Sequence, residues 1–184
     1  MNEYLSGSGE RTLVSLEASS CLRHRVRTLS INKLGDLIDN QAAPALWIDA
    51  PAGTGKTTTV IEALSAAKRF RAIKRISCYR GMRIEEALYW LNDFLLQAGI
   101  KEMDKVLGQR SRLEAKLSVL LNILSSHPVA VCFDDFHYLE AGSAKGSQVS
   151  LEDFVSACSS LQEDSPGNIA FTSTGNPPND AAIR

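Results

Sequence analysis

Residues 45–58 read ALWIDAPAGTGKTT, and this stretch decides the expected fold. The apolar run at 46–48 predicts a buried strand, and residues 58–64 have the pattern of a helix. Between them lies a glycine-bearing turn that ends in Gly-Lys-Thr. This order of strand, loop and helix is the setting of the phosphate-binding motif G-x-x-x-x-G-K-[ST]. The motif matches with one departure, Ala50 where the first glycine is usual.

The loop carries the groups that surround a phosphate. Gly53 and Gly55 let the backbone curl so that successive N–H groups converge, and the following helix adds the positive end of its dipole. Lys56 can reach the β- and γ-phosphates, and the Thr57 hydroxyl can ligate Mg²⁺. The residues expected to bind the nucleotide are Ala50, Pro51, Ala52, Gly53, Thr54, Gly55, Lys56, Thr57 and Thr58. The alternative, a turn that only caps a helix, is disfavoured by the flanking strand and helix.

The length and composition predict one soluble domain. A chain of 184 residues suffices for one α/β domain. Its net charge of −1 gives no general attraction to nucleic acid or to an anionic membrane. The four cysteines form no Cys-x-x-Cys pair, so neither a zinc site nor a disulfide framework is indicated. With no signal peptide and no membrane-spanning run, a cytoplasmic location is expected.

Strands alternate with helices along the chain, which predicts a mostly parallel sheet in a three-layer α/β fold. Residues 1–21 are expected to be a flexible leader, although residues 12–16 could add an edge strand, and residues 22–184 the domain. Strands are expected at 45–49, 72–79, 129–133 and 168–174, helices at 29–38, 56–69, 83–98, 112–126 and 151–164, a charged connector at 101–110 and a loop at 141–148. The leucine stripes of the helices should face the core, with Trp47 and Trp90 as core anchors.

An acid pair follows the apolar strand at 129–133. Because Asp134 and Asp135 come at the carboxyl end of this strand, they should emerge at the same sheet edge as the loop. Asp134 would then hold Mg²⁺ together with Thr57, and Asp135 would polarise the attacking water. The alternative is that two acids simply begin a solvated loop. His137 follows closely, and a packed or solvent-facing ring is expected for it.

The strand at 168–174 ends in three hydroxyl residues. Thr172, Ser173 and Thr174 could read the γ-phosphate or the attacking water. They could equally be ordinary strand-end residues, because serine and threonine are common there.

With these motifs, the chain resembles the nucleotide-binding module of the STAND class, the signal-transduction ATPases of the AAA+-related P-loop group. It is most similar to the large bacterial transcriptional activators of the maltose-regulon type. The resemblance rests on APAGTGKTT at 50–58, VCFDDFH at 131–137 and FTSTGNPP at 171–178.

The resemblance implies an ATP-dependent switch that binds ATP or ADP with Mg²⁺ and hydrolyses slowly, and that has protein partners or self-associates through downstream domains. By position, it assigns phosphate and metal contacts to Lys56, Thr57 and Thr58, the metal to Asp134, the water to Asp135 and the sensor position to Ser173. Thr174 stands where the class commonly has arginine, which bears on γ-phosphate sensing and on the rate of hydrolysis. The last strand and the lid have no counterpart before Arg184, so an incomplete core with an unpaired edge at its first strand is expected.

Other functions share the motif. A DNA-directed motor or loader would use the same loop, and Arg69, Arg71, Lys74, Arg75 and Arg80 form a local basic cluster. Such proteins generally prefer Asp-Glu at the acid pair and carry basic, aromatic surfaces for single strands. A third possibility is a nucleotide-binding scaffold that hydrolyses nothing. A small-molecule kinase is disfavoured because no arginine-rich lid is visible.

Overall fold

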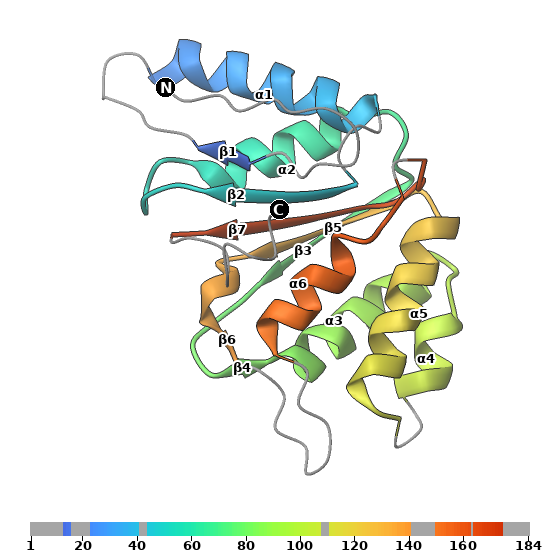
Figure 1. The fold of residues 1–184 in the computed structure, drawn as a ribbon. Coiled ribbons are helices and arrows are strands. Elements are labelled where there is room, and N and C mark those ends of the chain that lie inside the picture. The colour runs from blue at the N-terminus through green and yellow to red at the C-terminus, as the bar shows by residue number, and fades with distance from the viewer. Residues whose placement is uncertain are drawn as a thin grey trace.

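The chain folds into three layers, with a parallel sheet between two layers of helices (Figure 1). The computed structural model describes residues 13–15, 23–40, 44–107, 111–140, 150–162 and 164–174. Its strands are β1 (Leu13–Ser15), β2 (Ala45–Asp49), β3 (Ala72–Ser77), β4 (Met82–Arg83), β5 (Val129–Asp134), β6 (Leu139–Glu140) and β7 (Asn168–Ser173). Its helices are α1 (Arg23–Asp39), α2 (Lys56–Ala66), α3 (Ile84–Gln97), α4 (Glu102–Leu107), α5 (Leu113–Ser126), α6 (Leu151–Cys158) and the 3₁₀ turn η1 (Phe136–Tyr138). The expected α/β class and parallel sheet are confirmed.

The main sheet has the strand order β1-β2-β7-β5-β3, and each neighbouring pair is parallel. Because all strands run in one direction, β2, β5 and β7 end at the same edge of the sheet. Strand β7 lies between the strand that leads into the glycine loop (residues 50–55) and the strand that leads into the acid pair. Its last residue, Ser173, lies opposite Asp49 of β2.

Side chains alternate between the two faces of the sheet. On one face, Leu46 and Ile48 of β2 pack with Ala130 and Cys132 of β5 under α1 and α2. On the other face, Phe133 of β5 belongs to the larger cluster that packs against α3, α4, α5 and α6. Strand β5 is buried along its whole length, as expected for a strand that is covered on both sides.

The helices of the larger layer bury the leucine stripes as expected, for example Leu88 and Leu91 of α3. Trp47 is buried as predicted, but the prediction for Trp90 is wrong. Trp90 is 41% exposed on α3, and its ring packs against that of Tyr79. The charged connector expected at 101–110 contains helix α4, which buries Met103 and Leu107, one turn apart, against the core.

Strand β1 pairs in parallel with β2, and Leu13 lies opposite Trp47. The expectation that this edge of the first strand of the domain would be unpaired is therefore wrong, and part of the segment expected to be a loose leader is a strand. The apolar residues Leu13 and Val14 suit a strand, and the edge of β2 offers backbone groups that need partners. The loop expected at 141–148 lies outside the described residues.

Candidate functional site

The glycine loop has the backbone shape that its sequence requires. Gly53 and Gly55 have positive φ values of 77° and 85°, a region that residues with a Cβ rarely adopt. The backbone N–H and the hydroxyl of Thr54 both donate to the carbonyl of Pro51, at 3.4 and 2.8 Å, which closes the turn. Among the described residues Asp135 is the non-glycine residue with a positive φ, so Ala50 keeps ordinary backbone angles.

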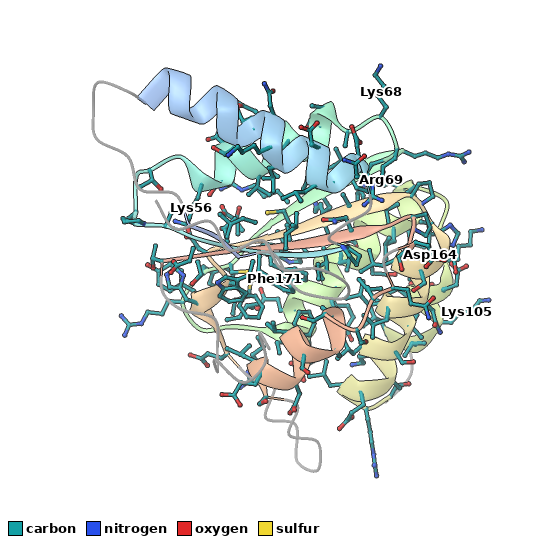
Figure 2. All side chains as sticks on the ribbon, turned by 45° about the horizontal axis from the view of Figure 1, so that its top comes forward. Lys56, Lys68, Arg69, Lys105, Asp164 and Phe171 are labelled. Atoms are coloured by element: carbon teal, nitrogen blue, oxygen red, sulfur yellow. The ribbon has the colours of Figure 1, made fainter. Side chains whose placement is uncertain are left out.

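Helix α2 begins directly after Gly55, with Lys56 as its first residue. The Lys56 side chain is buried, with 7% of its surface exposed, and its Nζ lies 3.5 Å from Asp135 Oδ1. Figure 2 shows Lys56 at one end of the sheet, and Lys68 and Arg69 at the opposite end. The loop lysine and the second acid, which are 79 residues apart in the sequence, therefore meet at one edge of the sheet.

Asp134 is the centre of the site. Its Oδ1 accepts hydrogen bonds from the hydroxyls of Thr57, at 2.5 Å, and Thr172, at 2.6 Å. Its Oδ2 accepts from Nε and Nη2 of Arg75, at 3.0 and 2.6 Å. Only 3% of the side-chain surface of Asp134 is exposed. The structure thus brings together the two residues that were expected to share a magnesium ion, Thr57 and Asp134.

These contacts fix the ionisation of Asp134. Burial by itself raises the pKa of this carboxyl group, but the hydrogen bonds from Thr172, Thr57 and Arg75, together with the charge of Arg75, outweigh it. The pKa of Asp134 is therefore below its ordinary value, and the group is a carboxylate at neutral pH. The nearby Cys78 is the reverse case, because burial and the two acids raise the pKa of its thiol to about 12. Cys78 is thus a protonated, unreactive thiol.

Thr172 contacts both acids, whereas the residue assigned to the sensor position was Ser173. The Thr172 hydroxyl donates to Asp134 and accepts from the backbone N–H of Asp135, at 3.1 Å. Ser173 is the next residue of β7, so its side chain is directed to the other face of the sheet. It is buried, and its carbonyl accepts from the backbone N–H of Ala50, at 3.3 Å. Strand alternation separates the two residues once the register of β7 against its neighbours is known.

Arg75 contacts Asp134 but was not predicted to belong to the site. The sequence analysis had grouped it with the basic cluster around β3. On β3, Arg75 lies opposite Cys132, and Ser77 lies opposite Asp134. Arg75 and Ser77 share the face of the sheet that α2 covers, together with Asp134. The cluster is not one surface, because Arg69 precedes β3 and packs over the Phe70 ring, while Arg80 follows the other end of the strand.

The remaining expected site residues lie at the rim. Thr58 is exposed on the first turn of α2, as are Pro51, Ala52 and Gly53 of the loop. His137 is exposed, as expected, and its Nε2 lies 3.2 Å from the hydroxyl of Thr174. Residues 175–178, part of the third segment of the resemblance, lie outside the described residues.

No family model matches this chain, and no curated protein is significantly similar to it. Within the described residues, no helix has both the length and the apolar character to cross a membrane.

Proposed function

We propose that this chain is the ATP-binding domain of a STAND-type P-loop NTPase, a regulatory switch that binds ATP or ADP with Mg²⁺ and hydrolyses slowly. The observation that carries the proposal is the 2.5 Å contact between Thr57 and Asp134, because it joins the helix that follows the glycine loop to the acid pair. Either motif alone is common, but their meeting at the carboxyl edge of a parallel sheet is the arrangement expected of a nucleotide site.

The residues around Asp134 suit a magnesium ion that is shared with a nucleotide. Thr57 and Asp134 offer hard oxygen ligands side by side, and Mg²⁺ prefers such ligands. In the described parts of the chain no group of three or more His, Cys, Asp or Glu side chains could form a complete protein cage for a metal. This fits Mg²⁺, which usually takes one or two carboxylates and completes its shell with water and substrate phosphates. A Mg²⁺ ion held by Thr57 and Asp134 would neutralise part of the negative charge of the phosphates.

Each residue then has a role that follows from its position. The N–H groups of the glycine loop and the first turn of α2 surround the phosphates. Lys56, now beside Asp135, would turn to the phosphate oxygens, and Asp135 would be left to orient and polarise the attacking water. The threonine at 172 holds the backbone of Asp135 and the carboxylate of Asp134 in fixed relation.

Nucleotide binding to a Lys56→Ala variant tests the proposal. We expect the parent chain to bind a fluorescent ATP analogue with an affinity that Mg²⁺ increases. The Lys56→Ala variant should lose at least about a hundredfold in affinity, because a charge-assisted contact in a buried site is worth several kcal/mol when truncated. Titration by fluorescence anisotropy, with Mg²⁺ and with EDTA, measures both.

Lys68→Ala is the matched control. Lys68 follows the other end of α2 and is exposed there (Figure 2), so its removal should leave the affinity unchanged. Equal affinity of Lys56→Ala and the parent would refute the site. Tight binding with no turnover in a single-turnover assay would favour the scaffold over the ATPase.

A further inference from the structure

Of the residues that contact Asp134, Arg75 is the charged one. The hydroxyls of Thr57 and Thr172 occupy Oδ1, and the guanidinium of Arg75 occupies Oδ2 with two N–H groups. The carboxylate is 3% exposed, while the Arg75 side chain, on the edge strand β3, is 52% exposed. The arginine thus reaches inward from the surface to a buried acid.

A buried carboxylate needs a compensating charge, and hydroxyl groups do not bring one. Lys56 lies beside the second acid, Asp135. For Asp134, the ion pair found among the described residues is the one with Arg75, at 2.6 Å. Each acid of the pair therefore has its own cation from the protein.

The two carboxylate oxygens of Asp134 have different hydrogen-bond partners. Oδ1 lies on the side of Thr57 and α2, where the metal is expected, and Oδ2 lies on the side of β3. A cation can therefore approach Oδ1 while Arg75 still holds Oδ2. The fixed positive charge of Arg75 then repels the incoming cation and cancels part of the attraction of Asp134.

We propose that Arg75 is a built-in counter-cation of Asp134 that weakens divalent-cation binding at the site. In this role Arg75 contacts the Asp134 carboxylate and not the metal. Its charge sets how high the concentration of the divalent cation must be before the cation occupies the site. The inference rests on the proposed function only in taking Asp134 as the metal carboxylate. It does not require that a nucleotide binds.

Mn²⁺ binding to the full-length chain without nucleotide tests this proposal, with free Mn²⁺ measured by electron paramagnetic resonance. Arg75→Gln keeps a hydrogen-bond donor and removes the charge, so it should bind Mn²⁺ more tightly by a factor on the order of ten. Arg75→Lys keeps the charge and loses the planar fork, and should stay within about threefold of the parent. Asp134→Asn should abolish the gain when it is combined with Arg75→Gln.

Lys74→Gln is the matched control. It removes the same charge from the neighbouring residue of β3, whose side chain is directed to the other face of the sheet, and should leave Mn²⁺ affinity unchanged. Unchanged or weaker Mn²⁺ binding by Arg75→Gln would overturn the proposal, as would an equal gain in Lys74→Gln.

Folding is checked in the same experiment, because the variant has an uncompensated buried carboxylate. If Arg75→Gln is unfolded in EDTA, refolding by Mn²⁺ supports the proposal and failure to refold overturns it. A separate ADP titration distinguishes the two proposals. Tighter Mn²⁺ binding by Arg75→Gln without any ADP binding by the parent would leave this inference standing and remove the proposed function.

Discussion

Asp135 has a positive φ of 55°, which is uncommon for a residue with a side chain and tolerated best by Asn and Asp. Strained backbone of this kind concentrates at functional sites and needs support from its surroundings. Here the support comes from Thr172, which accepts the N–H of Asp135, and from Lys56, which lies beside its carboxylate. The bend directs the second acid toward α2 and leaves 40% of its side chain exposed, open to a water molecule.

We expect Asp135→Asn to separate binding from turnover. Asparagine tolerates the same backbone angles and has the same size, so ATP affinity should stay within about threefold of the parent. Single-turnover hydrolysis should fall by at least about a hundredfold, because the carboxylate that polarises the attacking water is lost.

Asp164→Asn is the control for this experiment, since Asp164 is exposed and lies at the opposite end of the molecule from Lys56 (Figure 2). Hydrolysis by Asp135→Asn at the parent rate would show that the Asp135 carboxylate does not polarise the attacking water.

Some residues of the candidate site could be predicted from the sequence, and others could not. Lys56, Thr57 and the acid pair could be placed because their motifs fix both spacing and edge. The choice between Thr172 and Ser173 depends on the register of β7 against its neighbours, and no local pattern gives that register. Arg75 could not be assigned, since its partner Asp134 belongs to a strand that follows much later in the chain.

At the scale of elements, long periodic segments were predictable and short ones were not. The strands β2, β3, β5 and β7 and the helices between them follow from their apolar patterns. Helix α4 has six residues, too few for a clear period, and its helical state depends on the core that receives Met103 and Leu107. Strand β1 likewise has three residues, and only the presence of β2 beside it makes it a strand.

The entry into β7 depends on one close approach between elements. Gly167 donates its N–H to the carbonyl of Leu124 on α5, at 2.8 Å, and a Cβ at this position would lie 2.5 Å from that oxygen. We expect Gly167→Ala to destabilise the fold by about 1–3 kcal/mol, because backbone atoms must shift to admit the methyl group. Urea unfolding followed by circular dichroism measures this.

Gly35→Ala in α1 is the control, since apart from its own stretch of helix nothing lies within 4 Å of the added methyl group. Alanine is the better helix former by about 0.5–1 kcal/mol, so this variant should be as stable as the parent or more so. If Gly167→Ala unfolded at the same urea concentration as the parent, the close packing of β7 on α5 would be disproved.

At the scale of the whole molecule, charge bears on the alternative of a DNA-directed motor. The net charge is −1, Arg69 and Arg80 lie beyond opposite ends of β3, and Arg75 is engaged with Asp134. The low net charge and the engaged arginine give a phosphate backbone little general attraction. The composition already gave the near-neutral net charge, and the strand expected at 72–79 already placed Arg69 before it and Arg80 after it. The pairing of Arg75 with Asp134 became evident only in the fold.

We expect no steeply salt-dependent binding of single-stranded DNA. Anisotropy of a labelled oligonucleotide, measured between about 50 and 200 mM salt, should stay near that of the free strand, because counterion release needs clustered cations. A single-strand binding protein is the positive control. DNA-stimulated ATP turnover that is lost at high salt would favour the motor.

An aromatic cluster packs on the other face of the sheet from the acid pair. Phe133 precedes Asp134, Phe136 follows Asp135 and Phe171 precedes Thr172, and the three rings pack on one another with centroids 4.9–6.3 Å apart. In each of these pairs the aromatic residue packs on the face of the sheet away from α2, and its polar neighbour is directed toward α2. We therefore expect the ends of β5 and β7 to keep their positions when a ligand binds, and any rearrangement to occur in the glycine loop.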